Sequence, residues 1–240
     1  MLCVQMEGLL CMSVIMSVIL LQSCSCIDEN HLAQMVNVIW TNYRPGKMFS
    51  IAASIPKIKN QVGTFDFHQV LNTKNAEEVK NVIMGGHVYK TGRIVAATFI
   101  PKPKEGTKGN IHAEYRVLQN FDNLINQESD LKNDLMLFYV LAAPCTVKCT
   151  NENHQESILN YLKKLKKWTH YAVVFSYLYK PNNSQHIPDK DRKAGIERLG
   201  KDLGLKNVFR CVKNNEGRMQ CSTCAGANNQ AAQTCFSDSV

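Results

Sequence analysis

Four residues in two short segments place the strongest constraint on this chain of 240 residues. His112 and Glu114 are separated by one residue; after 29 further residues Pro144 is followed by Cys145, with Cys149 four positions later. One imidazole and two thiolates can hold Zn²⁺ and leave the fourth tetrahedral position open, as in catalytic zinc sites. We therefore expect His112, Cys145 and Cys149 to bind one zinc ion.

The spacing of the two cysteines predicts a helix that begins near Pro144. Residues four apart share one face of a helix, and proline is favoured in the first helical turn. Cys145 and His112 would then both lie at helix starts, where the helix dipole favours thiolate. The alternatives are an ordinary packed histidine and two cysteines that are buried or form a disulfide. The order and separation of the two segments favour zinc.

These two segments are similar to the signature of zinc-dependent nucleobase deaminases, His-x-Glu followed by Pro-Cys-x-x-Cys. The resemblance implies that zinc activates a water molecule and that Glu114 moves protons to the base and the leaving amine. One departure is that three residues, not two, separate Cys145 from Cys149.

The first 26 residues predict export. Residues 9–21 contain only Leu, Ile, Val, Met, Ser and Cys, a run too short to span a bilayer, and small residues suited to cleavage follow it. The usual basic start is missing, with Glu7 in its place, so a short anchor or a later start is the alternative. We expect a signal peptide over residues 1–26, a secreted, extracellular protein, and no transmembrane segment in the mature chain.

Four further cysteines lie close together near the C-terminus: Cys211, Cys221, Cys224 and Cys235. In an exported protein they predict two disulfides, with three possible pairings. The alternative is a second, structural zinc site, because two residues separate Cys221 from Cys224. We assign residues 214–240 to a Cys-rich tail.

Apolar patterning over residues 27–213 predicts one α/β domain with a five-stranded mixed sheet and helices on both faces. Because a helix connects strands four and five, these two strands should run parallel. The expected strands cover residues 49–55, 93–100, 134–143, 171–179 and 207–212, and the expected helices cover 31–43, 76–84, a segment starting near 112, 156–168 and 189–203.

Residues 31–213 resemble the secreted AID/APOBEC-like deaminases, which implies their three-layer cytidine-deaminase-like fold. The parallel strands four and five are similar to those of the AID/APOBEC and tRNA adenosine deaminase branch, whereas free-nucleoside cytidine deaminases have a hairpin there. Tyr177 and Tyr179 are placed like that family's aromatic substrate loop. A departure lies at Ala142 and Ala143, where relatives usually carry Ser-Trp-Ser, so one wall of the base pocket is missing.

Basic and aromatic side chains favour a single-stranded nucleic acid as substrate. The net charge is +8, and the expected contacts are Tyr43, Arg44, Tyr177 and Tyr179, together with lysines in residues 102–108 and 163–167. Residues 182–184 form a glycosylation sequon, at which a glycan would obstruct a long strand. The resemblance implies deamination of cytosine in DNA or RNA and a role in immune defence. The alternatives are free nucleosides or adenine as substrate, and a catalytically inactive extracellular binding module.

Overall fold

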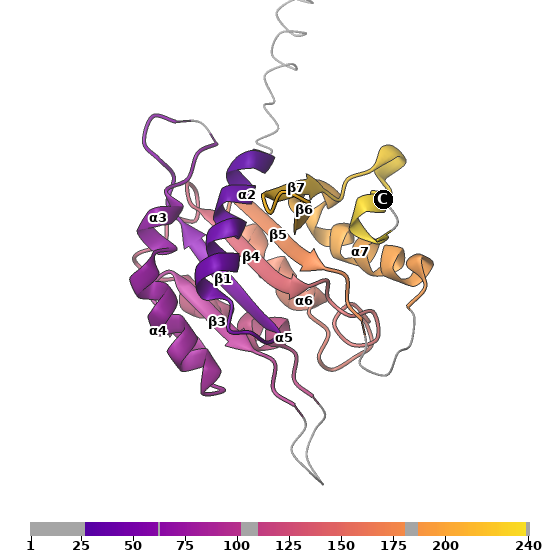
Figure 1. Ribbon diagram of the computed structural model, residues 1–240, viewed down its shortest axis with the longest axis horizontal. Coiled ribbons are helices and arrows are strands. Elements are labelled where there is room, and N and C mark those ends of the chain that lie inside the picture. Colours follow the sequence, from indigo (N-terminus) through magenta and orange to yellow (C-terminus); the bar gives the residue numbers. More distant parts are fainter. Residues whose placement is uncertain (1–26, 62, 102–109, 181–186, 239–240) are drawn as a thin grey trace, which may run out of the picture.

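The computed structural model describes residues 27–61, 63–101, 110–180 and 187–238 (Figure 1). Seven strands form one sheet in the order β2-β3-β1-β4-β5-β6-β7. Their bounds are β1 Phe49–Ile55, β2 Tyr89–Thr91, β3 Ile94–Thr98, β4 Leu135–Ala142, β5 His170–Tyr177, β6 Val208–Lys213 and β7 Met219–Thr223.

Helices cover both faces of this sheet, as the sequence predicts. Apolar residues of α2, α3 and α4 pack with Ile51 of β1 in one core, and those of α5, α6 and α7 pack with Ala52 in the other. Successive strand residues point to opposite faces, so both faces of the central strands are buried. The helices are α2 Glu29–Val38, α3 Phe67–Val70, α4 Thr73–Met84, α5 Ala113–Gln119, α6 Leu159–Leu162 and α7 Asp189–Leu203. No helix of the described residues is long and apolar enough to cross a membrane.

Strand direction brings several loops together at one end of the strands. β4, β5 and β6 run parallel, which confirms the direction predicted for the last two expected strands, now β5 and β6. β1 is antiparallel to β4, so the start of β1 lies beside the end of β4. Residues that precede β1 or follow β3, β4 and β5 therefore meet at the same end of the strands.

The predicted count of five strands is wrong, because β2 and β7 extend the sheet at its two edges. β2 has three residues, of which only Tyr89 is buried, so it lacks an alternating pattern that the sequence could reveal. β7 lies in the segment assigned to the tail and pairs antiparallel with β6, with Cys221 directly opposite Cys211. The Thr223 N–H also donates to Glu29 of α2, which fixes β7 to the helical layer.

The helix predicted from Pro144 is also absent. Residues 146–150 form a turn, in which the Thr150 N–H donates to the Cys145 carbonyl at 3.0 Å. Arg198 of α7 holds this turn open by donating from Nε to the Thr150 carbonyl at 2.5 Å. A side chain from a distant helix thus replaces the hydrogen bonding that a local helix would provide.

The helix predicted over residues 156–168 is shorter than expected. Its α-helical part is α6, and a 3-10 helix over Lys163–Lys167 continues it. The buried residues of α6, of the 3-10 helix and of the position just after it are spaced by three, which matches the three residues per turn of a 3-10 helix. They are Leu159, Leu162, Leu165 and Trp168.

Candidate functional site

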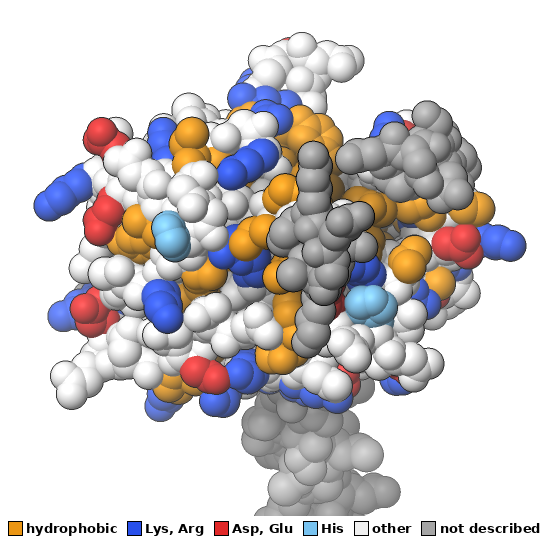
Figure 2. All heavy atoms as spheres, turned by 90° about the horizontal axis from the view of Figure 1, so that it is seen from below, with side chains coloured by type: hydrophobic (Ala, Val, Ile, Leu, Met, Phe, Trp, Pro, Cys, Tyr) orange, Lys and Arg blue, Asp and Glu red, His pale blue; other side chains and the backbone are white. Residues whose placement is uncertain are grey.

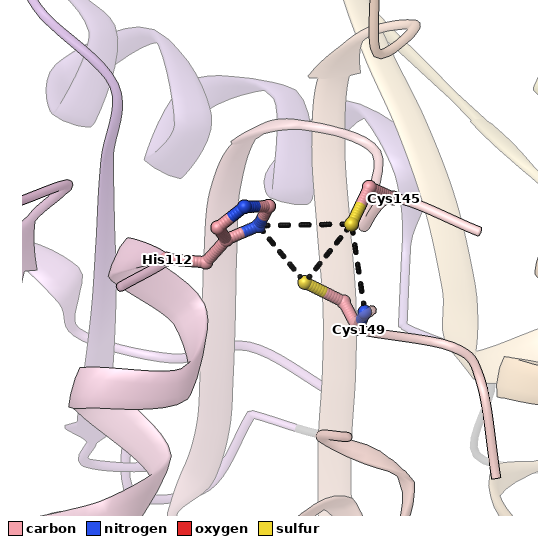
Figure 3. A group of neighbouring side chains, drawn as sticks. All are labelled: His112, Cys145 and Cys149. Atoms are coloured by element: carbon pink, nitrogen blue, oxygen red, sulfur yellow. Dashed lines mark hydrogen bonds between the residues drawn. The ribbon is translucent and has the colours of Figure 1, made fainter. Parts of the chain in front are cut away.

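Three side chains converge where α5 begins and β4 ends (Figure 3). His112 is the residue immediately before α5, and Cys145 and Cys149 belong to the turn that follows β4. His112 Nδ1 lies 3.1 Å from the Cys149 sulfur and 3.7 Å from the Cys145 sulfur, and the two sulfurs are 3.5 Å apart. The structure thus brings together the three ligands predicted from sequence.

These separations fit a tetrahedral zinc site. Zinc bond lengths of about 2.0–2.3 Å place neighbouring tetrahedral ligand atoms about 3.5–3.8 Å apart. The measured separations of 3.1–3.7 Å are close to those values, and one nitrogen with two sulfurs is a donor set that zinc prefers. Among the described residues, this is the one cluster of His, Cys, Asp and Glu side chains arranged to hold a metal ion.

Glu114 lies beside the ligands without belonging to that cluster. It sits in the first turn of α5, is 5% exposed, and accepts a hydrogen bond from the Cys149 thiol at 3.0 Å. The same oxygen lies 3.6 Å from His112 Nδ1. Burial raises the pKa of Glu114, but the neighbouring His112 imidazole lowers it by a larger amount, so the pKa is below its usual value. A buried, ionised carboxylate is therefore available next to the ligands.

The ligand side chains have thiolate and imidazolium character. Hydrogen bonding with the Cys149 side chain lowers the pKa of Cys145 to about 4. Burial opposes this effect, and His112 adds to it. Burial lowers the pKa of His112, but Cys145 and Glu114 outweigh it and raise this pKa to about 10. The Cys145 thiolate and burial raise the pKa of Cys149. Zinc ligation requires two thiolates and a neutral imidazole, so binding of the metal would displace the protons of His112 and Cys149.

A pocket with a volume of about 630 Å³ opens beside Glu114, at the end of the sheet where β3, β4 and β5 finish. Figure 2 shows this end of the molecule, where hydrophobic and basic side chains gather near the middle of the face. The lining residues are Met48, Phe99, Asn110, His112, Ala113, Glu114, Ala142, Ala143, Tyr177, Leu178, Tyr179, Lys180, Arg210 and Asp238.

Two of the four predicted substrate contacts line this pocket, namely Tyr177 and Tyr179. Arg44 is linked to them indirectly, because its guanidinium stacks 4.6 Å from the centre of the Trp40 ring, which lies 5.4 Å from the ring of Tyr177. Tyr43 does not line the pocket: it is fully buried, and its hydroxyl donates to backbone carbonyls. The structure therefore places Tyr43 in the core.

The sequence did not indicate several pocket residues. Phe99 follows β3, and its ring lies 5.9 Å from that of His112. A prediction that ended this strand at Thr98 could have placed Phe99 beside the site. Lys180, Arg210 and Asp238 had no local signal, because only the folding of the chain brings β6 and the C-terminal segment to the site. Residues 102–108 and the sequon at 182–184 lie outside the described residues.

Two acidic neighbours offset part of the positive charge of the lysine-rich segment after α6. Lys164 and Lys167 both pair with Asp122, and Lys163 pairs with Asp202. These side chains do not line the pocket. This segment therefore gives less support to nucleic-acid binding than its sequence does.

The four cysteines near the C-terminus form two disulfides, Cys211–Cys221 and Cys224–Cys235. This selects one of the three possible pairings and rules out the alternative of a structural zinc site at these residues. Cys145 and Cys149, in contrast, are free.

Comparison with known proteins agrees with this geometry. No curated protein and no solved structure matches the chain. One family model, described as Secreted Novel AID/APOBEC-like Deaminase 1, matches residues 29–239, which include all three ligands, Glu114 and both disulfides. The chain therefore belongs to the family of Secreted Novel AID/APOBEC-like Deaminase 1.

Proposed function

We propose that this protein is a zinc-dependent deaminase that hydrolyses the exocyclic amine of cytosine in single-stranded DNA or RNA. The observation that carries the proposal is the buried Glu114 carboxylate, which lies beside three converging ligand atoms in the wall of an open pocket. Membership of an AID/APOBEC-like deaminase family supports the same class of reaction.

In this mechanism His112 Nδ1 and the sulfurs of Cys145 and Cys149 would hold Zn²⁺. Bound zinc supplies Lewis acidity, which lowers the pKa of a coordinated water toward neutrality. A Glu114 carboxylate oxygen accepts a proton from the attacking water and passes protons to the ring nitrogen and the leaving amine. Water adds at C4 and ammonia leaves, so that cytosine becomes uracil.

The pocket lining supports a planar base as substrate. Phe99, Tyr177 and Tyr179 provide aromatic surface, and stacking on a base contributes about 1–3 kcal/mol. The small side chains of Ala142 and Ala143 leave room for the ring. Because no tryptophan narrows the pocket at these two positions, adenine is the alternative base.

Free nucleosides are the second candidate substrate. The ion pairs of Lys163, Lys164 and Lys167 with acidic residues favour them, because these pairs reduce the positive charge available to a long polyanion. A deaminase of nucleosides would convert cytidine readily and would show no salt-dependent binding of oligonucleotides.

We also propose that the protein acts outside the cell, in defence against foreign nucleic acid. The two disulfides fit an oxidising compartment, and the family description includes secretion. The predicted signal peptide over residues 1–26 lies outside the described residues.

The test compares the wild-type protein with Glu114→Ala and Glu114→Gln, each at about one zinc per chain. Substrates are single-stranded DNA and RNA containing every base, cytidine and adenosine. Deamination raises the mass by about one dalton, and we expect either substitution to lower turnover by at least about 10²–10⁴-fold while zinc is retained. Absence of turnover by zinc-loaded wild-type protein would refute the proposal and favour a binding module.

A further inference from the structure

The C-terminal segment contributes one wall of the pocket. Asp238 lines the same cavity as His112 and Glu114, although it lies far from both in the sequence. Figure 1 shows this segment, in yellow, beside β6 and α7, and the disulfide Cys224–Cys235 attaches it to the end of β7.

Arg210 of β6 holds this segment in place. Its side chain is 14% exposed, and one guanidinium nitrogen donates to the carbonyls of Thr234 and Ser237, at 2.7 and 2.9 Å. Another nitrogen donates to the Asp238 carboxylate at 2.9 Å, and Nε donates to the Ser176 carbonyl of β5. These bonds extend from the sheet to the C-terminal segment, so the position of Asp238 is built into the fold.

Asp238 balances the positive charge at its end of the pocket. Its carboxylate pairs with Arg210 and, at 3.4 Å, with Lys180, whose side chain is 73% exposed. Burial raises the pKa of Asp238, but Arg210 and Lys180 together lower it by a larger amount, so the carboxylate is ionised at neutral pH. Without this carboxylate the two cations would form a favourable place for a phosphate group.

We propose that Asp238 is a specificity-determining residue, which weakens binding of a phosphate carried by the target nucleoside. The carboxylate repels a phosphate directly and occupies the donors of Arg210 and Lys180 that would otherwise bind it. This proposal rests on the proposed deaminase reaction, because it requires the target nucleoside to enter the pocket beside Glu114. It favours the free nucleoside, the second candidate substrate, over a polynucleotide.

The test measures dissociation constants of cytidine, cytidine 3′-monophosphate and cytidine 5′-monophosphate by calorimetry. All proteins carry Glu114→Gln, which prevents turnover, and have equal zinc content. Asp238→Asn removes the charge and keeps an oxygen that accepts from Arg210. We expect it to lower the dissociation constant of at least one monophosphate, relative to cytidine, about three- to tenfold at low salt, and less at high salt.

Asp202→Asn is the matched control. Asp202 is 40% exposed, compared with 48% for Asp238, and it also pairs with a lysine, but it does not line the pocket. The compared quantity is the ratio of each monophosphate's dissociation constant to that of cytidine. The proposal is overturned if Asp238→Asn leaves both ratios unchanged, if Asp202→Asn changes them equally, or if neither monophosphate binds to the Asp238→Asn protein. Turnover is measured separately on proteins with Glu114 intact. A protein that deaminates nothing but shows the shifted ratio would refute the proposed function alone.

Discussion

At Gly195, α7 packs closely against the segment that carries Cys145 and Cys149. A Cβ atom at this glycine would lie 3.0 Å from Cγ2 of Thr146 and 3.3 Å from the Thr150 hydroxyl oxygen. Both threonines belong to the segment that carries Cys145 and Cys149. We therefore predict that Gly195→Ala weakens zinc binding.

Two opposing effects set the size of the change. Alanine is favoured over glycine inside a helix by about 1 kcal/mol. The new carbon contact at 3.0 Å is shorter than the preferred distance of about 3.5–4.0 Å, and overpacking typically costs about 1–3 kcal/mol. The free energy of unfolding should therefore fall by no more than about 2 kcal/mol. Because a turn yields more easily than a helix, we expect displacement of the ligands and a zinc affinity lower by about tenfold.

Zinc affinity is measured by competition with a chromophoric chelator, and stability is measured by denaturant unfolding. Thr146→Ser removes Cγ2 and should restore most of the affinity in the double variant. Gly200→Ala is the control in the same helix: its Cβ would lie 2.5 Å from Leu205, away from the turn, so stability should fall without loss of zinc affinity. Unchanged zinc affinity in Gly195→Ala, or a loss that Thr146→Ser does not restore, would refute this reasoning.

Two further predictions concern stability. Tyr43→Phe removes hydrogen bonds to the carbonyls of Val70 and Asn72, so the free energy of unfolding should fall by about 1 kcal/mol, with deamination unchanged. A large change in KM would instead show that Tyr43 contacts substrate. Replacing Cys211 and Cys221 by alanine opens a loop with a sequence separation of 10, so we expect a loss of about 2–3 kcal/mol in denaturant unfolding. A loss below about 1 kcal/mol would show that pairing of β6 with β7 suffices without the disulfide.

The central part of the fold could be predicted because its strands are buried on both faces. β1 and β4 consist entirely of buried residues, and α7 has the same bounds as its prediction. The edge strands could not be found in this way. β2 has one buried residue, and β7 depends on its neighbours, Cys211 across the ladder and Glu29 of α2, for its position.

The candidate metal-binding cluster could be predicted for a different reason, because its residues lie in two short segments of the sequence. His112 and Glu114 lie close together at the start of α5, and Cys145 and Cys149 lie close together because one turn connects them. The prediction of a helix at Cys145 failed because Arg198, from α7, binds Thr150 and fixes a turn instead. Local spacing therefore indicated which side chains come together, while giving the wrong backbone conformation.

The wall of the pocket shows why the reaction was easier to predict than its selectivity. The candidate metal cluster needs only the end of β4 and the start of α5, whereas the pocket lining also includes Lys180 after β5, Arg210 of β6 and Asp238 near the C-terminus. Arg210 and Asp238 contact each other only because β6 is parallel to β5 and the disulfide Cys224–Cys235 folds the chain back. Under the proposed function, recognition of the atoms around the base would thus depend on residues that the motif does not contain.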